Sequence, residues 1–299
     1  MKKYDVVLLT ESRYLNPKNP DAYSQNILLE DRLIQEELEA LSLKCHREDW
    51  ARPDFDWSQT RFALFRTTWD YFHRFDEFSV WLNHASKKTT LINSLNQIQW
   101  NMDKHYLRDL ESKGVNTVET FFIEAGETKS LDQIYQKLGW DECVLKPAVS
   151  GAGRHTYRLS QKTIKDHLAV FSKLIKKESM LLQPFQKDVM ERGEISLMLF
   201  AGKYSHAVIK IAKPGDFRVQ DDFGGSVEPY QASSEEISLA EEAFAACEST
   251  PVYGRADIIR DNDKQLAITE LELIEPELWL RVERKAAKKF ANAVAQKIL

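Results

Sequence analysis

Along the first hundred positions, short continuous apolar runs alternate with stretches in which apolar residues have helical spacing. The runs Tyr4–Leu9 and Phe62–Phe65 are short and apolar, which predicts buried strands, and Thr89–Ile92 predicts a third. In Gln25–Leu43 and Phe75–His84 the apolar residues recur with the spacing of a helix that buries one face. Because strands alternate with helices, this first unit predicts a parallel α/β sheet.

Further along the chain the pattern changes, and expected strands follow one another more often. These strands are Thr117–Ile123, Glu142–Lys146, His155–Leu159, Met180–Pro184, Glu194–Phe200 and Ser205–Ile211. The expected helices are Asp103–Lys113, Leu131–Leu138, Lys162–Lys177, Ser234–Cys247 and Leu278–Ile298. We therefore predict an α+β second unit with antiparallel strands. The junction near Asn93–Asn101 does not have the composition of a flexible linker.

Carboxylates gather on two further expected strands near the end of the chain. Arg255 and Asp257 alternate with small residues, and Glu270 and Glu272 alternate with leucines. Residues two apart on a strand face the same side of the sheet. The polar stretch 261–264 supplies turn residues between the two strands, so we predict a hairpin.

A symmetric turn in this hairpin would pair Asp257 with Ile268 and Arg255 with Glu270. That register puts four charged side chains on one face: Arg255, Asp257, Glu270 and Glu272. Three carboxylates on one face are costly unless a cation or solvent compensates their charge. Oxygen ligands at this spacing suit Mg²⁺, which also binds substrate phosphates and water.

A strand that ends in lysine runs into a loop of small residues. Lys146 is followed by Ser150, Gly151 and Gly153. Backbone N–H groups can approach phosphate oxygens only where side chains are small, so the loop is a candidate phosphate site. It is not a Walker A loop, because no Gly-Lys-Ser/Thr follows the glycines. A plain surface turn would have the same composition, and the segment alone leaves both interpretations open.

A second candidate for nucleotide binding is the strand end at Gln183, Pro184 and Phe185. Proline interrupts a strand and leaves backbone groups unpaired, and such groups can hydrogen-bond an adenine edge. Glu194, after a glycine, could accept hydrogen bonds from ribose hydroxyls. Taken alone, the stretch is more typical of an ordinary strand end.

Three other polar positions can each be interpreted as functional or as ordinary structural or surface residues. Arg218 lies in a glycine-containing stretch and could bind phosphate or carboxylate, or be a solvated arginine in a hairpin. Lys104 falls on an expected amphipathic helix, where a solvated lysine is the default. His206 shares a strand face with Lys210, and we expect it to be a satisfied strand histidine. No histidine has metal-ligand spacing to a cysteine or second histidine, and no nucleophile elbow is present.

Length, charge and cysteine content narrow the class of protein. The 299 residues are enough for roughly two domains. The net charge of −5 argues against general nucleic-acid binding. Cys45, Cys143 and Cys247 are scattered and form no CxxC pair, which is typical of a reducing cytosol. No apolar stretch approaches membrane-spanning length, so we expect a cytoplasmic protein without a membrane partner.

Taken in order, these motifs resemble the ATP-grasp superfamily, over about residue 93 to the end of the chain. The residues that carry the resemblance are Lys104, Lys146 with its loop, Gln183, Pro184, Phe185, Glu194, Arg218, Arg255, Asp257, Glu270 and Glu272. The chain is most similar to the glutathione-synthetase/RimK-like ligases. Within them, the stretches 65–71, 100–104, 215–218 and 270–276 resemble the O-ureidoserine cyclo-ligase group of cycloserine biosynthesis. The resemblance implies a pre-ATP-grasp α/β domain over residues 1–98 and a two-lobed ATP-grasp domain with antiparallel sheets over residues 99–299.

The resemblance also implies roles for these residues. Phosphates of ATP would be neutralised by Lys104 and Lys146, and the loop that contains Ser150, Gly151 and Gly153 would close over them. Adenine would contact the Gln183–Phe185 segment, and ribose would contact Glu194. Mg²⁺ would be held by Asp257, Glu270 and Glu272. Arg218 and Arg255 would stabilise an acyl phosphate and the later oxyanion.

Glu272 is one departure from the family pattern, because many members have Asn at this position. A third carboxylate would make the site more negative and could strengthen cation binding. It could also change the preference between Mg²⁺ and Mn²⁺.

The expected activity is an ADP-forming ligation of a small carboxylate to an amine through an acyl phosphate. Such a reaction needs positioning and charge neutralisation rather than a protein nucleophile. Arg66 and Asp70 follow an expected strand of the first unit, where ligands bind open α/β sheets. We therefore expect them, with Lys210 as a further candidate, to hold an amino-acid-like substrate. A structural corner at Arg66–Tyr71 is equally compatible with the sequence.

Two alternatives share the same phosphate and metal residues. A small-molecule kinase would stop after phosphoryl transfer to a hydroxyl. A nucleotide-binding regulatory protein would bind ATP without turnover. The sequence identifies neither co-substrate, and a homodimer is expected only because dimers are the commonest assembly.

Overall fold

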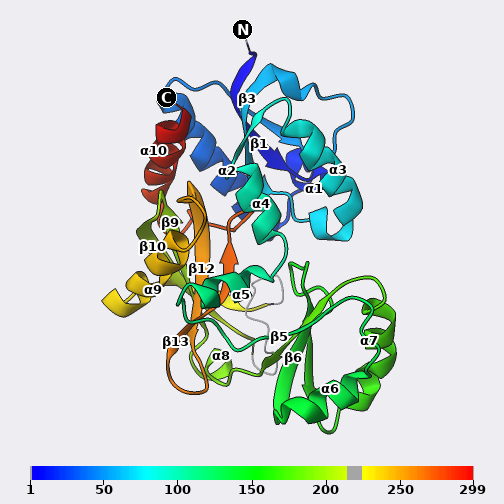
Figure 1. Cartoon of the computed structure of the whole chain (residues 1–299). Helices are drawn as coiled ribbons and strands as arrows, with labels where there is room; N and C mark the ends of the chain where they lie inside the picture. The colour runs from blue at the N-terminus through cyan, green and yellow to red at the C-terminus, as the bar shows by residue number, and fades with distance from the viewer. Residues whose placement is uncertain (1, 214–223, 299) are drawn as a thin grey trace.

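The computed structural model describes residues 2–213 and 224–298, which form three sheets with helices around them (Figure 1). The first sheet has the strand order β2-β1-β3-β4, and its strands are parallel. The bounds of its strands are Tyr4–Thr10 (β1), Cys45–Asp49 (β2), Thr60–Thr67 (β3) and Thr90–Ile92 (β4). The predicted parallel α/β sheet is therefore confirmed. Strand β2 was not expected, because its sequence CHRED is polar and lies at the sheet edge.

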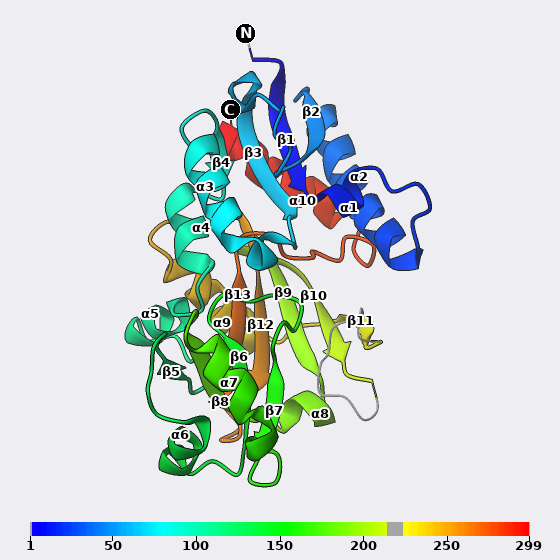
Figure 2. The same cartoon turned by 90° about the vertical axis from the view of Figure 1, so that its right-hand side faces the viewer.

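Helices cover both faces of this first sheet, which explains why its central strands β1 and β3 contain continuous apolar runs. Val6 and Leu8 point into one core with α2, whereas Val7 and Leu9 point into another with α3. The helices of this region are Ser12–Leu15 (α1), Ala22–Ala40 (α2), Trp57–Gln59 (η1), Tyr71–His73 (η2) and Phe75–Ala85 (α3). The face beside α2 is completed by the last helix of the chain, Ala286–Ile298 (α10) (Figure 2).

The last helix was predicted to begin at Leu278, and this is wrong. It begins at Ala286, because Trp279 has a left-handed backbone (φ +46) that an α-helix cannot contain; the N–H groups of Leu278 and Leu280 bond to the carboxylate of Glu30. Helix α10 packs on α2, so the end of the chain belongs to the core of the first sheet. The domain boundary between residues 98 and 99 stays a prediction.

The second sheet is antiparallel, with the order β11-β10-β9-β12-β13. Its strands are Glu194–Phe200 (β9), Lys203–Ile211 (β10), Ser226–Tyr230 (β11), Tyr253–Arg260 (β12) and Leu266–Glu272 (β13). One face is covered by the helices Tyr106–Ser112 (α5) and Ser234–Ala245 (α9). On the other face, Met198 and Phe200 pack against α10, and Glu194 and Ser196 continue the same face beyond that core. This uncovered part of the face carries the candidate site.

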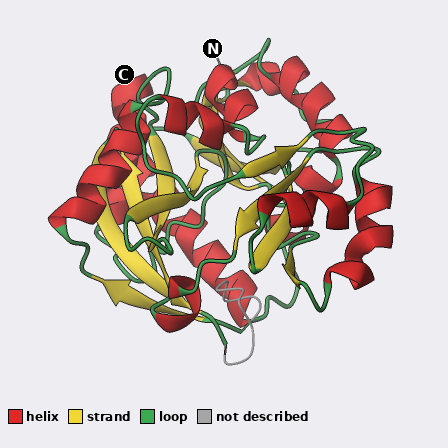
Figure 3. Ribbon diagram, turned by 60° about the horizontal axis from the view of Figure 1, so that its bottom comes forward, coloured by secondary structure: helices red, strands yellow, loops and turns green. Residues whose placement is uncertain are grey.

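The third sheet is smaller and also antiparallel, with the order β5-β8-β6-β7. Its strands are Phe121–Ile123 (β5), Glu142–Pro147 (β6), Tyr157–Ser160 (β7) and Met180–Pro184 (β8). The remaining helices are Leu95–Asn101 (α4), Leu131–Leu138 (α6), Ile164–His167 (η3), Leu168–Leu174 (α7) and Asp188–Glu191 (α8). Two predictions need correction: only Phe121–Ile123 of the first expected strand is a strand, and the helix expected over 162–177 is split into η3 and α7. Figure 3 shows the helices around the sheets.

No helix of the described ranges 2–213 and 224–298 combines the length and apolar character needed to cross a membrane.

Candidate functional site

A cavity of about 750 Å³ lies where the three sheets approach one another. Its walls come from every part of the fold, for example Asp70 after β3, Lys146 on β6 and Asp257 on β12. Among the residues predicted for the site, those that line it include Lys104, Ser150, Gly151, Gly153, Gln183, Pro184, Phe185, Glu194, Lys210, Arg255, Glu270 and Glu272. The structure therefore brings together residues that are far apart in the sequence.

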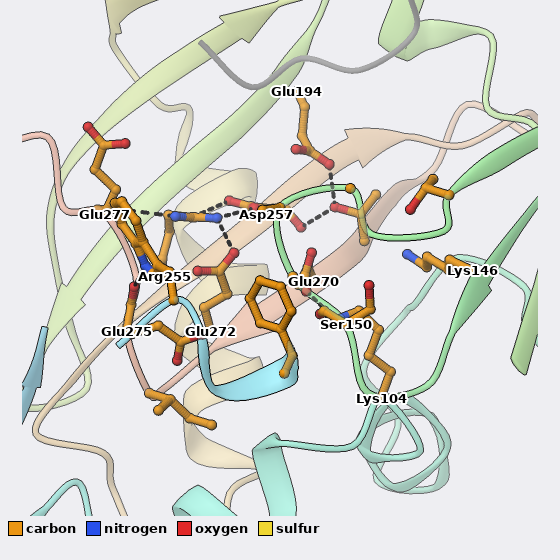
Figure 4. A pocket seen from close by; sticks show the side chains of 18 of the residues that line it. Lys104, Lys146, Ser150, Glu194, Arg255, Asp257, Glu270, Glu272, Glu275 and Glu277 are labelled. Atoms are coloured by element: carbon orange, nitrogen blue, oxygen red, sulfur yellow. Dashed lines mark hydrogen bonds and ion pairs between the residues drawn. The ribbon is translucent and has the colours of Figure 1, made fainter. Parts of the chain in front are cut away.

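Asp257, Glu270 and Glu272 form the centre of this cavity, and we call them the acidic trio. One oxygen from each lies within 4.8 Å of the others. Figure 4 shows Arg255 on one side of the trio and Lys104 and Lys146 on the other. The predicted clustering of these carboxylates on one face of a hairpin is thus confirmed.

The predicted pairing within the hairpin is wrong. Asp257 lies opposite Glu270 and Arg255 opposite Glu272, because the register shifts between Asp257 and Ile258. Thr269 is the extra residue of this β-bulge, since Ile258 pairs with Ile268 and Asp257 with Glu270. The bulge leaves the acidic trio on one face and brings the hydroxyl of Thr269 to within 2.7 Å of Glu194 Oε1.

The edge strand β13 is held from outside by two side chains that the sequence did not single out. The N–H of Leu271 donates to the hydroxyl of Tyr106, and the N–H of Leu273 donates to the side-chain oxygen of Asn101. These bonds satisfy backbone donors that an edge strand would otherwise leave unpaired. They fix the part of β13 that presents Glu270 and Glu272.

Asp257 is buried among hydrogen-bond donors. Its Oδ1 accepts from Ser196 Oγ at 2.5 Å and from Arg255 Nε at 2.8 Å, and its Oδ2 accepts from Lys210 Nζ and Arg255 Nη2, both at 2.9 Å. Burial alone would raise the pKa of this carboxyl, but Arg255 and Lys210 outweigh it and hold the pKa well below its usual range. Asp257 is therefore ionised at neutral pH.

Glu270 faces the two lysines of the site. Its Oε1 lies 2.7 Å from Lys104 Nζ, which also donates to the backbone oxygen of Ser150 at 2.7 Å. Burial would raise the pKa of Glu270, but Lys104 and then Lys146 lower it below its ordinary value. Lys104 is only 7% exposed, so the default interpretation of a solvated lysine was wrong.

Lys146 has no ion pair with any residue in the described part of the chain. Burial lowers its pKa, Glu270 opposes this change, and Lys104 adds to it. An ammonium without a carboxylate partner inside a cavity favours binding of an anion there. Lys146 therefore has the environment expected of a phosphate-binding lysine.

The pKa values of Glu272 and Glu275 are raised, in contrast to those of Asp257 and Glu270. Burial raises the pKa of Glu272 to about 7; Arg255 opposes this, and Glu270 and Asp257 add to it. Burial and the neighbouring Glu272 raise the pKa of Glu275 to about 8. These acids gain a proton at neutral pH unless a cation binds beside them.

The carboxylate oxygens of the acidic trio differ in how many hydrogen bonds they already accept, and so in how readily they could bind a metal ion. Both oxygens of Asp257 already accept two hydrogen bonds, whereas Glu270 and Glu272 each keep one oxygen without a donor among the described residues. A carboxylate has about four acceptor positions, so Asp257 can still contribute to a metal site. The donor set consists only of oxygen atoms, which fits Mg²⁺ or Mn²⁺.

The small-residue loop after β6 is braced at both of its ends. Ser150 Oγ donates to the backbone oxygen of Arg154 at 3.0 Å, and Arg154 forms two bonds of 2.8 Å with Glu178. A Cβ at Gly151 would lie 2.6 Å from the ring of Phe72, so the backbone approaches the first sheet closely at this point. Gly153 has φ +66, which favours glycine.

The expected adenine and ribose residues lie at the cavity wall with partners of their own. Gln183 donates to Thr120 Oγ1 at 2.8 Å, and the ring of Phe185 is covered by the guanidinium of Arg158 at 3.7 Å. Pro184 pairs with Cys143 in the sheet. Glu194 lies 2.6 Å from Lys210 Nζ, which joins it to Asp257.

Three predicted substrate or catalytic residues need separate comment. Arg66 is 1% exposed and does not line the cavity; its guanidinium binds Glu30, so the direct substrate contact predicted for it is not what the structure shows. Asp70 does line the cavity, where it accepts from Trp50 and Arg74. Arg218 lies outside the described residues.

His206 is a buried strand histidine, as expected. Its Nε2 is 2.8 Å from the backbone oxygen of Leu278, and burial lowers its pKa to about 4.

Several aromatic and acidic residues line the cavity although the sequence analysis assigned them no role: Trp69, Phe72, Glu275 and Trp279. Trp279 lies beyond the hairpin, and its ring is 4.9 Å from the guanidinium carbon of Arg255. No periodicity marks such residues, because loops deliver them. Two of them, Trp69 and Glu275, fall within the family-like stretches 65–71 and 270–276.

Two family models match the chain. Residues 116–276 match the model described as prokaryotic glutathione synthetase, ATP-grasp domain. Residues 6–93 match the model described as D-cycloserine synthetase DcsG, N-terminal domain.

Individual relatives agree with these matches. The cycloserine biosynthesis protein DcsG of Streptomyces lavendulae is 28% identical over 264 residues, which cover 84% of this chain and 87% of that protein. The crystal structure of D-cycloserine synthetase DcsG has a TM-score of 0.86 at 26% identity and covers 98% of this chain and 99% of that chain.

Two more distant structures share the fold. The D-alanine–D-alanine ligase from Bacillus anthracis has a TM-score of 0.65 at 15% identity, and covers 99% of this chain and 97% of that one. The ATP-grasp ligase PsnB, solved with a minimal precursor, Mg and ADP, has a TM-score of 0.63 at 13% identity, with 98% of both chains covered.

Proposed function

Because this chain belongs to the prokaryotic glutathione synthetase ATP-grasp family and is an ATP-grasp ligase that forms C–N bonds, we propose that it joins a small amino-acid-like carboxylate to an amine through an acyl phosphate. One observation carries the proposal. The acidic trio shares a cavity with Lys104 and Lys146, so that a candidate metal site and two cations suited to phosphate lie side by side.

In the proposed first step, an oxygen of the substrate carboxylate attacks the γ-phosphorus of ATP. The bond to the bridging oxygen breaks, and ADP leaves with the electron pair. Lys146 and Lys104 face the phosphates and offset their charge, while the loop after Lys146 offers backbone N–H groups. Bound Mg²⁺, held by the acidic trio, would add Lewis-acid stabilisation of the phosphate oxygens.

In the second step, the amine attacks the acyl carbon, and phosphate leaves from the tetrahedral intermediate. Arg255 uses four of its N–H groups on Asp257, Glu272 and the backbone oxygen of Glu277. A guanidinium has five N–H donors, so, counting contacts with the described residues, one remains for an oxyanion. The amine loses a proton in this step. Phosphate as a leaving group or solvent can accept this proton, so no protein base is required.

The proposal is tested by an ADP-release screen of amino acids and small carboxylates, with and without amine acceptors. ADP release that requires both a carboxylate and an amine supports ligation. A stable phosphorylated hydroxyl product without an amine would indicate a kinase, and ATP binding without ADP release across the panel would indicate a regulatory protein. Glu270→Gln should abolish metal-dependent turnover with little change in the unfolding transition, since Glu270 is partly exposed.

The DcsG relative supports an amino-acid-like substrate but does not fix its identity. The expected homodimer and the cytoplasmic location stay predictions.

A further inference from the structure

We propose that Glu30, on helix α2 of the first sheet, is a positioning residue for the ligase reaction, because it fixes Trp279 over the cations of the site. The inference rests on the proposed function, which assigns Arg255 to the reaction centre. Glu30 does not line the cavity and would act through the segment that joins β13 to α10, which runs beneath α2 (Figure 2).

Trp279 has an unusual backbone conformation. Its φ is +46, in the left-handed region that a bulky residue adopts only when its surroundings impose it. Such a conformation is unfavourable and occurs most often at functional sites. Something in the structure must therefore hold this residue in place.

The carboxylate of Glu30 holds Trp279 from both sides. Its Oε1 accepts the N–H of Leu278 at 2.9 Å, and its Oε2 accepts the N–H of Leu280 at 2.9 Å. The residues that flank Trp279 thus bind one anion with their backbone donors, in the manner of an anion-binding nest. Because Glu30 is 5% exposed, water does not compete for these bonds.

Arg66 completes the arrangement from the other side of Glu30. Its Nη2 lies 2.5 Å from Glu30 Oε1, and its Nη1 donates to the backbone oxygen of Pro276 at 3.3 Å. Arg66 therefore compensates the buried charge and also restrains the chain just before Trp279. This explains a buried arginine that does not reach the cavity.

The ring that this arrangement fixes contacts the site directly. The indole of Trp279 lies 4.9 Å from the guanidinium carbon of Arg255 and 5.8 Å from Lys210 Nζ. Arg255 Nη1 also donates to the backbone oxygen of Glu277, in the same segment. A cation over an aromatic face is stabilised and oriented. Glu30 thus controls the direction in which Arg255 presents its remaining N–H.

A buried ion pair by itself is weak evidence for a role in stability or function. Here the hydrogen bonds of Glu30 go to the two neighbours of a left-handed residue whose side chain contacts two cations of the site. Support of this kind from a second layer of residues typically changes activity about 10- to 100-fold when it is removed.

The first experiment does not depend on activity. The protein is labelled with 5-fluorotryptophan, and the resonance of Trp279 is identified by its loss in Trp279→Phe. Glu30→Gln keeps the shape of the side chain but sets an amide NH₂ against one of the two N–H donors. We expect the Trp279 resonance to shift or split. The resonances of the other six of the seven tryptophans should change little. Glu36→Gln, an exposed change on the same helix, should leave it unchanged.

The second experiment measures ADP release, once a substrate pair is known. Glu30→Gln should lower kcat about tenfold and leave the KM for ATP within about twofold, because the nucleotide contacts lie elsewhere. In the Glu30→Gln/Trp279→Phe double variant the two losses in kcat should not multiply, since both act through the same ring.

The outcomes separate the two proposals. If no substrate pair gives turnover with the wild type, the proposed function fails, and the fluorine spectra still test Glu30. An unchanged Trp279 resonance in a folded Glu30→Gln variant overturns the positioning role. Fully multiplicative effects in the double variant overturn it as well. If Glu30→Gln does not fold, Arg66→Lys, which retains the charge but loses the bond to Pro276, is measured in both experiments instead, with the same criteria.

Discussion

The ammonium of Lys104 lies 2.7 Å from a carboxylate oxygen of Glu270 and 2.7 Å from the backbone oxygen of Ser150. One side chain therefore joins the acidic trio to the small-residue loop. In the proposed reaction this is the place where metal and phosphates would meet.

Replacing Lys104 with Met should remove a phosphate cation and release the loop at Ser150. We expect the KM for ATP to rise at least about tenfold, because a charge-assisted contact contributes roughly 1.5 to 3 kcal/mol. Titration calorimetry with a non-hydrolysable ATP analogue should show a matching loss of affinity. Lys137→Met, on an exposed face of α6, is the control and should bind the analogue normally.

Glu272 should determine the metal dependence. In Glu272→Asn, one negative charge leaves the acidic trio, so the affinity for Mg²⁺ should fall about tenfold or more. The ratio of activity with Mn²⁺ to activity with Mg²⁺ should change in the same variant. Equal metal titration curves for the wild type and Glu272→Asn would remove Glu272 from the metal site.

Stability of the metal-free protein should decrease as pH rises. Burial raises the pKa of Glu272 from an ordinary 4.5 to about 7 and that of Glu275 to about 8. Between pH 4.5 and these raised pKa values, the folded state therefore binds more protons than the unfolded state. The stability that these protons provide is complete below about pH 4.5 and is lost as pH rises through 7 to 8.

Urea unfolding in EDTA between pH 5 and pH 8.5 measures this loss. Glu272 is about three-quarters buried, and its contribution is on the order of 2 to 3 kcal/mol. Glu272→Gln/Glu275→Gln should flatten the dependence, and Mg²⁺ should stabilise the wild type more at high pH than at low pH. A pH-independent free energy of unfolding in the wild type would contradict the assignment.

The bulge residue Thr269 should link the hairpin to Glu194. Thr269→Val keeps the shape but removes the donor to Glu194 Oε1 and to the backbone oxygen of Asp257. We expect a loss of about 1 kcal/mol in the free energy of unfolding and a higher KM for ATP. Thr269→Ser, which retains the hydroxyl, should behave like the wild type; equal defects in both variants would show that the methyl group matters instead.

The sequence predicted the shared face of the acidic trio although it predicted the wrong pairs. A strand places alternate residues on opposite faces, so a shift of one residue would have moved Glu270 and Glu272 away from Asp257. The actual turn differs from the symmetric one by one residue, and the bulge at Thr269 adds another. The total shift of two residues restores the face. Pairing could not be predicted, because a bulge has no reliable signature in one sequence.

Residues that are delivered by distant loops were beyond prediction for a different reason. Arg66 was expected in the cavity because of its place at the end of a strand of an α/β sheet. In the structure its guanidinium instead binds Glu30 of α2. Trp279 belongs to no helix, since its backbone is left-handed (φ +46) and the last helix begins only at Ala286. Only the tertiary arrangement shows these contacts. The order of the lysines, glycines and acids, in contrast, was sufficient for the family and for the fold.

Helix α10 has a consequence for how the chain is made. Residues 286–298 complete the core on one face of a sheet whose first strand is Tyr4–Thr10. During synthesis, that face stays without its last cover until residues 286–298 have left the ribosome. The first sheet should therefore acquire protection from proteases only late in translation, although it is made first. Ribosome-bound chains stopped before residue 286 should be digested within β1 and α2, and chains with a linker long enough to bring residue 298 out of the ribosome should resist.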